Sequence, residues 1–401
     1  MEEKNVLIKG LNKSRGEFLE ENMIENKMIY LDHAATTSIN EEVLKEMMPY
    51  LTNQYGNPSS IYSFGRKSKK SIEKAREQIA ATINAKKSEI YFTSGGTEAD
   101  NWAIKGIAGY YKKKGKHIIT SSIEHHAVIN SCKRLEGEGF EISYLPVDKD
   151  GKISIEDLKK SIRKDTILIS IMMANNEIGT VEPIAEIGKI AREKGIIFHT
   201  DAIQAVGCIT IDVEDLQVDL LSISAHKFYG PKGVGALYIR KGTGIDSLMD
   251  GGEQEKGKRG STENVASIVG IGKAIELANK NLIEYQKKLC CLRDEAIIQI
   301  LKNIPNTKLN GHAVDRLPGN VNILFEGMEA ETMILKLDKM GFAISSGAAC
   351  SSGLTEPSHV LKAIGLSHEK AQCSLRFTFG EENNIKDVKK LVEALKKIYF
   401  N

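Results

Sequence analysis

Two ionisable residues each follow an apolar run that is typical of a buried strand. Asp201 follows the run 196–200, and Lys227 follows the run 218–224. A lysine held among apolar side chains has a lowered pKa, so its amine can form a Schiff base. A carboxylate can keep a pyridinium ring protonated, so such a pair is typical of enzymes that use pyridoxal phosphate. The alternatives are a surface lysine and a helix N-cap.

The segment Ser94-Gly95-Gly96-Thr97 could bind the phosphate group of such a cofactor. It follows an expected strand at 89–93 and leads into an expected helix that contains Trp102. Glycines let backbone amides approach an anion at a helix N-terminus, and Thr97 adds a hydroxyl donor. The alternative is an ordinary capping box at the same residues.

Cys350 lies in a run of small residues that extends from Ser345 to Gly353. Such a run cannot form a packed core, so we expect the thiol on an exposed, mobile loop. Exposure and mobility suit a nucleophile that must move between two positions. A surface cysteine without a function is the alternative.

Arg376 lies in a segment, 374–379, in which apolar and polar residues alternate. Its side chain should therefore point away from Leu375 and Phe377. A guanidinium group there could bind a substrate carboxylate through two hydrogen bonds. A structural salt bridge is the competing explanation.

Two other patterns do not indicate sites. The segment 252–258 matches the start of a phosphate-binding Walker A loop, but Arg259 replaces the Ser or Thr that binds magnesium, and no apolar strand precedes it. His125 and His126 suggest metal binding, yet adjacent side chains on a strand point to opposite faces, so at most one should reach a shared site. We therefore expect no metal.

The strands and helices expected around these residues indicate an α/β fold. We expect strands at 117–121, 166–172, 195–200 and 218–224 that alternate with helices such as 184–194, a pattern typical of a mostly parallel sheet. Each strand is followed by polar or small residues. Because ligands bind at the carboxyl ends of parallel strands, these residues should share one site.

The last third of the chain changes in character. We expect one long helix from 265 to about 304, followed by strands at 320–325 and 374–379, which together indicate a smaller α+β domain. The expected organisation is a charged extension at 1–27, a segment at 28–38 that joins the small domain, a large domain at 39–284 and a small domain at 285–401 that carries Cys350.

Composition excludes several classes of protein. The 401 residues include 55 Lys and Arg against 53 Asp and Glu, which gives no basis for nucleic-acid or polybasic membrane binding. The longest apolar stretch, 167–174, is much shorter than the ~20 residues of a membrane-spanning helix. Six cysteines without a CxxC pair indicate neither a disulfide scaffold nor a zinc module. Residues 1–27 lack the features of a targeting signal, so we expect a cytoplasmic protein.

Six segments, in order and with close spacing, resemble cysteine desulfurases of the NifS/IscS type. They are Tyr30–Thr37, Gly56–Ser60, Thr93–Glu98, Asn175–Gly179, Ser224–Lys227 and Ala349–Gly353. The resemblance extends from about residue 28 to the C-terminus. It implies the class V aminotransferase branch of fold type I pyridoxal phosphate enzymes, with a mostly parallel, seven-stranded sheet flanked by helices in the large domain.

The resemblance also implies roles for individual residues. Lys227 would bind pyridoxal 5'-phosphate as a Schiff base, Asp201 would contact its ring nitrogen and Cys350 would carry the persulfide. His125 would stack on the ring and assist proton transfer. The other cofactor-binding residues would be Gly96, Thr97, Asn176, Gln204 (to the phenolic oxygen), Ser224, His226 and, from the neighbouring subunit, Thr262. The substrate carboxylate would lie near Asn176 and Arg376.

The activity that this resemblance implies is conversion of L-cysteine to L-alanine by a homodimer. The sulfur would pass from Cys350 to an acceptor protein, such as a scaffold for iron–sulfur cluster assembly. A selenocysteine lyase or an aminotransferase on the same scaffold is the alternative, and a non-catalytic partner protein is disfavoured by the intact residue set. The sequence departs from the family pattern at Glu253 and Ser261, where glycines are usual, and in the extension 1–27.

Overall fold

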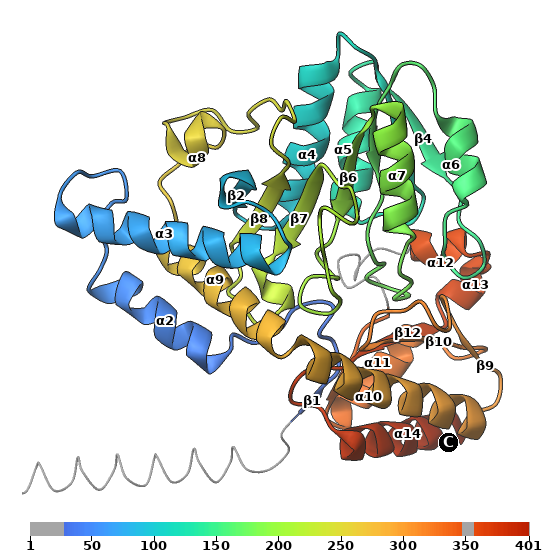
Figure 1. Ribbon diagram of the computed structural model, residues 1–401. Coiled ribbons are helices and arrows are strands. Elements are labelled where there is room, and N and C mark those ends of the chain that lie inside the picture. The colour runs from blue at the N-terminus through green and yellow to red at the C-terminus, as the bar shows by residue number, and fades with distance from the viewer. Residues whose placement is uncertain (1–27, 347–356, 401) are drawn as a thin grey trace, which may run out of the picture.

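The large sheet has seven strands in the order β2-β8-β7-β6-β5-β3-β4. This computed structural model describes residues 28–346 and 357–400, and Figure 1 shows the large sheet above a smaller one. Strands β3 to β7 pair in parallel, whereas β8 runs antiparallel to β2 and β7. The predicted mostly parallel α/β sheet is confirmed. Its strands are β2 (Ile90–Thr93), β3 (His117–Ser121), β4 (Glu141–Leu145), β5 (Thr166–Ser170), β6 (Ile197–Asp201), β7 (Leu220–Ser224) and β8 (Gly235–Ile239).

Helices cover both faces of this sheet. Neighbouring residues of one strand, such as Leu220 and Leu221, belong to different apolar clusters, because successive side chains point to opposite faces. Burial on both faces explains why the strands are continuous apolar runs in the sequence. One cluster includes α4 (Gly96–Tyr111) and α5 (His126–Glu136), and the other includes α2 (Glu41–Thr52), α3 (Ser63–Thr82), α6 (Ile155–Ser161), α7 (Ile184–Lys194) and α9 (Val265–Lys280).

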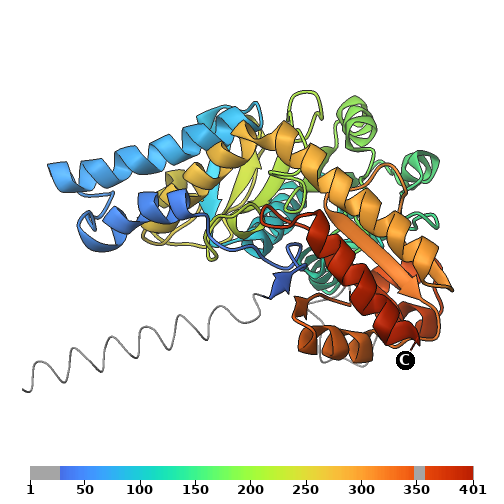
Figure 2. The ribbon, with the colours of Figure 1, turned by 90° about the horizontal axis from the view of Figure 1, so that it is seen from below.

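A separate apolar cluster lies around the second sheet, whose order is β12-β10-β9. Leu31 joins this cluster because β1 (Ile29–Tyr30) pairs in parallel with β11 (Phe342–Ala343). Figure 2 shows α10 beside the red helix α14 against this sheet. The elements here are β9 (Thr307–Leu309), β10 (Asn320–Phe325), β12 (Ser374–Thr378), α10 (Leu282–Asn303), α11 (Ala330–Lys339) and α14 (Ile385–Phe400). The short helices α12 (His359–Ala363) and α13 (His368–Ala371) instead pack with Ile123, Met172 and Ile178 from loops of the large sheet.

The prediction of a single helix from 265 to about 304 is wrong. The structure has two helices, α9 and α10, which meet at Asn281. The backbone of Asn281 has φ −102° and ψ 4°, and its N–H bonds to Leu277 and Asn279, which ends α9. Asparagine forms helices poorly because its side chain competes with backbone hydrogen bonds. None of the helices in the described parts of the chain is long and apolar enough to span a membrane.

A buried ion pair fixes the loop that resembles a Walker A segment. This loop contains the short helix α8 (Gln254–Gly257), and Glu255 within it adopts φ +44°. Both side-chain oxygens of Glu255 accept hydrogen bonds of 2.8 Å from Arg76, and Glu255 Oε2 also accepts the N–H of Phe92 at 3.0 Å. The two side chains are 3% and 5% exposed. Glu255 therefore points into the protein and attaches the loop to α3 and β2.

We predict that Glu255→Gln lowers the free energy of unfolding by about 3–5 kcal/mol, since it removes the buried charge partner of Arg76 and leaves only the half-exposed Glu73. Chemical denaturation measures this difference. Glu73→Gln is the matched control, because Glu73 also contacts Arg76 at 3.1 Å but is 42% exposed, and its loss should cost less than about 1 kcal/mol. Equal effects of the two variants would contradict the prediction.

Candidate active site

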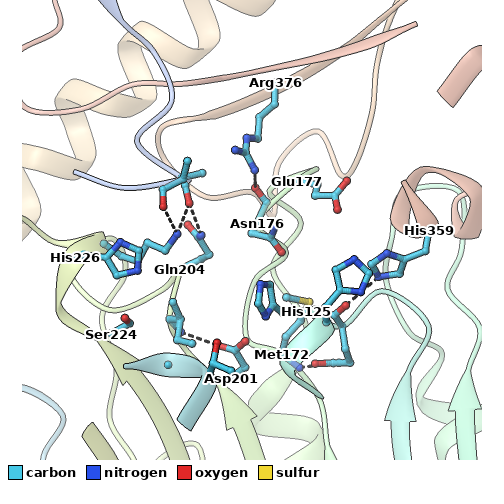
Figure 3. A pocket seen from close by; sticks show the side chains of 18 residues that line it. His125, Met172, Asn176, Glu177, Asp201, Gln204, Ser224, His226, His359 and Arg376 are labelled. Carbon is cyan, nitrogen blue, oxygen red and sulfur yellow. Dashed lines mark hydrogen bonds between the residues drawn. The ribbon is translucent and has the colours of Figure 1, made fainter. Parts of the chain in front are cut away.

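A cavity of about 280 Å³ opens at the carboxyl ends of the large sheet (Figure 3). It brings together nearly all the residues predicted to act on a cofactor or substrate, which are Gly96, Thr97, His125, Asn176, Asp201, Gln204, Ser224, His226, Lys227 and Arg376. Thr262 lines a different cavity of about 180 Å³, together with Ser94 and Gly233. Cys350 lies outside the described residues.

The topology of the sheet explains this convergence. Asp201 is the last residue of β6, and Lys227 ends η2 (Ala225–Lys227), the turn that directly follows β7. Gly96 begins α4, which lies against β7 and β8. Carboxyl ends of parallel strands meet at one edge, so their following residues face one space. Arg376 enters from β12 of the second sheet, opposite Asp201 in Figure 3.

Lys227 is held at the cavity by backbone carbonyls. Its Nζ atom donates hydrogen bonds to Ala34 and, at 2.8 Å, to Ala35. Gln204 Nε2 donates to the same Ala34 oxygen at 2.9 Å. The segment between β1 and α2 therefore positions two residues of the site. The sequence did not reveal this role, because every residue has a backbone carbonyl group whatever its side chain.

Asp201 is a buried carboxylate at the floor of the cavity. It accepts the N–H of Ile203 at 2.9 Å and is 5% exposed. Burial raises the pKa of Asp201 to about 6, although the hydrogen bond from Ile203 and the charge of Lys227 oppose the shift. At neutral pH the residue is therefore an anion, which can stabilise a protonated ring nitrogen.

The start of α4 forms a cradle for an anion. Gly95 adopts φ +156°, a conformation that favours glycine, and a Cβ atom on Gly96 would lie 2.1 Å from Ile203 Cδ1. Thr97 follows in the first turn, where unpaired N–H groups and the helix dipole favour a phosphate. Ser224 and His226 line the same wall, and His226 Nδ1 lies 3.1 Å from Thr36 Oγ1. The glycines, the hydroxyls and Asp201 together fit pyridoxal 5'-phosphate.

His125 is the N-cap of α5, and its Nδ1 atom accepts the N–H of Ala127 at 3.2 Å. Burial, with the nearby charge of Lys227 as a smaller cause, lowers the pKa of His125 to about 4. The ring is therefore neutral at pH 7 and carries its proton on Nε2. Because the ring lines the cavity, this N–H is available to a bound ligand.

The expectation that only one of His125 and His126 reaches the site is wrong. Both residues line the cavity, with ring centroids 6.3 Å apart. They lie at the start of a helix rather than on a strand, so their side chains do not alternate between opposite faces. No group of three or more metal-ligating side chains is present within residues 28–346 and 357–400.

Arg376 both lines the cavity and forms a salt bridge. One of its amino groups donates to Asp32 Oδ1 at 2.7 Å, and the other donates to the backbone oxygen of Asn176 at 3.0 Å. The side chain is 2% exposed. The salt bridge, one of the two explanations that the sequence left open for Arg376, is present in the structure, and it holds the guanidinium at the wall of the cavity. Binding of a substrate carboxylate by Arg376 stays a prediction.

Two carboxyl groups in the polar segments that follow strands, Glu124 and Glu177, line the cavity, although sequence reasoning assigned them no individual role. Glu124 accepts hydrogen bonds from Ser121 Oγ at 2.6 Å and from the N–H of Met172 at 3.0 Å, and burial raises its pKa to about 8. Burial also raises the pKa of Glu177, whose carboxylate accepts a hydrogen bond from Ser358. Both follow strands in the sequence, but only the structure shows that they are buried.

Comparisons with known proteins agree with this geometry. The model of the family "Aminotransferase class-V" matches residues 29–391. The cysteine desulfurase IscS of Clostridium botulinum is 56% identical over 375 residues, which cover 93% of this chain and 94% of that protein. This chain belongs to the class-V aminotransferases, among the cysteine desulfurases of the IscS and NifS type.

Solved structures of desulfurase relatives have the same fold. A NifS-like protein superimposes with a TM-score of 0.88 at 36% identity, over 93% of this chain and 99% of its own. SspA, solved in complex with cysteine, gives a TM-score of 0.79 at 38% identity, over 88% and 98% of the two chains. The predicted family, enzyme class and fold are confirmed. The roles of individual site residues and the domain boundaries stay predictions.

We predict that His125 is the neutral Nε2–H tautomer at pH 7 and takes up a second proton only near pH 4. Burial disfavours the imidazolium form, and the Ala127 N–H already occupies Nδ1. Nitrogen-15 NMR of histidine-labelled protein, assigned with His125→Gln, measures both properties. A protonated ring at pH 7, or a proton on Nδ1, would contradict this assignment.

Proposed function

We propose that this chain is a pyridoxal 5'-phosphate-dependent cysteine desulfurase that converts L-cysteine to L-alanine and collects the sulfur as a persulfide on Cys350. The observation that carries the proposal is the single cavity lined by Lys227, Asp201 and Arg376. These side chains supply an amine, an anion for a ring nitrogen and a cation for a substrate carboxylate. The cysteine bound to the related SspA supports the choice of substrate.

The cofactor contacts follow from the shape of the cavity. Gly96, Thr97, Ser224 and His226 would hold the phosphate at the start of α4, and Gln204 would donate to the phenolic oxygen. Asp201 would keep the ring nitrogen protonated from the opposite end. Pyridoxal 5'-phosphate supplies, when bound, an aldehyde that condenses with amines and a ring that accepts electrons released at the substrate Cα atom.

Lys227 and His125 would handle protons. The Lys227 amine would take the proton from the substrate Cα atom and later return one to the product. Ala34 and Ala35 stabilise the protonated amine through their carbonyl groups. The Nε2–H of His125 faces the same space and can donate to the reacting group. In its neutral state at pH 7, the ring contributes this hydrogen bond without adding a positive charge to the cavity.

Arg376 and Asn176 would orient the substrate. A guanidinium group binds a carboxylate through directed hydrogen bonds, so it fixes which substituent of the Cα atom faces the lysine. Asn176 adds a polar contact beside it, and its backbone oxygen already accepts a hydrogen bond from Arg376. This orientation directs the substrate sulfur away from the carboxylate-binding wall.

The sulfur transfer would use Cys350 as the nucleophile. Its thiolate attacks the sulfur of the substrate, so that a sulfur–sulfur bond forms while the carbon–sulfur bond breaks. The electron pair of the broken bond remains on the carbon atom, which is protonated to give alanine. The enzyme persulfide then passes its outer sulfur to an acceptor protein, such as an iron–sulfur scaffold. In the proposed homodimer, Thr262 would contact the cofactor phosphate of the partner subunit.

We predict that Cys350→Ala binds pyridoxal 5'-phosphate and keeps its yellow absorption but loses at least 100-fold in sulfide release from cysteine with a thiol reductant. The reason is that the variant keeps the whole cavity and lacks only the sulfur acceptor. Lys227→Ala is the matched control, which should lose the covalent link to the cofactor. Sulfide release by Cys350→Ala at the parent rate would refute the persulfide step. It would instead favour a lyase on this scaffold, whereas an aminotransferase would release no sulfide from cysteine in the parent either.

We predict that Asp32→Asn raises KM for cysteine by about 10-fold or more and changes kcat less, since a hydrogen bond to a charged group contributes about 1.5–3 kcal/mol. Asp32 holds the Arg376 guanidinium but does not itself line the cavity. The cofactor absorption spectrum should not change. A lower KM would show instead that Asp32 competes with the substrate carboxylate.

A further inference from the structure

A second acidic residue lies beneath the proposed cofactor site, and the mechanism above does not use it. Asp100 is in the second turn of α4, one turn after Gly96, and is fully buried. Neither of its side-chain oxygens has a partner at ordinary hydrogen-bond geometry among the described residues, and the Ser222 hydroxyl is the nearby group that could donate to it. An ionised carboxylate in this position would be strongly destabilising, whereas a protonated one costs much less.

One ionisable neighbour of Asp100 is a histidine that does not neutralise it. His199 lies on β6 two residues before Asp201, so both side chains are on the same face of the strand. Its Nε2 atom is 3.7 Å from Asp100 Oδ1, which is too long for a hydrogen bond. Both ring nitrogens instead contact hydroxyl groups, Ser170 Oγ at 2.9 Å and Ser222 Oγ at 3.0 Å. Burial lowers the pKa of His199 to about 3, so the ring is neutral.

The other charged groups around Asp100 are acidic. Burial raises the pKa of Asp100 well above its usual range, and the negative charge of Asp201 adds to the shift, although a hydrogen bond from the nearby Ser222 hydroxyl opposes it. Glu124 adds a smaller effect only where it is ionised, which is above its pKa of about 8. Asp201 differs because it has a backbone N–H donor, touches the cavity and feels the positive charge of Lys227. Of the two aspartates, Asp100 therefore binds a proton more strongly.

We propose that Asp100 is a positioning residue that holds one proton beneath the cavity, so that the Asp100–Asp201 pair has a single negative charge, located on Asp201. The inference rests on the proposed function for the contact between Asp201 and the ring nitrogen. A second charge on Asp100 would increase the proton affinity of Asp201, and a protonated Asp201 could no longer stabilise a positive ring. His199, with Ser170 and Ser222, fills the space between the strands with a neutral polar group.

Infrared difference spectroscopy of the full chain tests directly whether Asp100 is protonated. At pH 7, Asp100→Asn should remove one C=O stretching band of a protonated carboxylic acid, and the variant should bind pyridoxal 5'-phosphate within about threefold of the parent affinity, since asparagine imitates the neutral acid. Glu124→Gln is the matched control, because it removes its own band and leaves that of Asp100. Loss of a carboxylate band in Asp100→Asn would overturn the proposal.

The coupling between the two residues has a separate measurement, which also applies if Asp100→Asn fails to fold. In Asp201→Asn, the Asp100 band should disappear at a lower pH than in the parent, because the neighbouring negative charge is gone. An unchanged midpoint would overturn the proposal. Failure of the proposed function is distinguishable, because it would appear as a parent protein that gains no visible absorption with pyridoxal 5'-phosphate while these infrared bands are unchanged.

Discussion

One buried negative charge, at the carboxyl end of β6, is the constraint around which the site is built. Asp201 is 5% exposed, yet it must be ionised to stabilise a cationic ring. The structure meets this requirement with a backbone donor from Ile203 and with the charge of Lys227 across the cavity. This carboxylate is therefore suited to stabilising a cationic ligand.

The cavity also depends on contacts between the two sheets. The large sheet supplies Asp201 and Lys227, whereas β12 of the small sheet supplies Arg376. The chain segment after β1 connects them, because Asp32 binds Arg376 and the Ala34 carbonyl accepts hydrogen bonds from Lys227 and Gln204. A change in the packing of this segment would therefore move the amine and the guanidinium together.

Much of the fold could be predicted because buried strands and helices require apolar residues at regular positions in the sequence. Strand β10 and helix α7 have the predicted bounds, and β3 also matches, since each is an uninterrupted apolar or periodic run. Asp201 and Lys227 could be proposed because each follows such a run. The break at Asn281 was not predicted, because the residues on both sides have good helix propensity and one asparagine gives a weak signal.

The rest of the site could not be predicted, because it depends on three-dimensional partners. The Ala34 and Ala35 carbonyls, the burial of Glu124 and the contact between Asp100 and His199 join residues that are distant in sequence. The Asp32 partner of Arg376 is also remote, and only its geometry shows that a salt bridge and a ligand-binding role are compatible.

The parallel pairing of β1 with β11 has a consequence for biosynthesis. Ile29 pairs with Phe342, and Leu31 packs in a core whose other members begin at Leu289. The ribosome therefore releases this strand long before its partner exists, while the large sheet can already pair its own strands during translation. The small core closes last, and its closure brings Asp32 to Arg376. Catalytic competence should thus be acquired in a late step, after the cofactor-binding half has become compact.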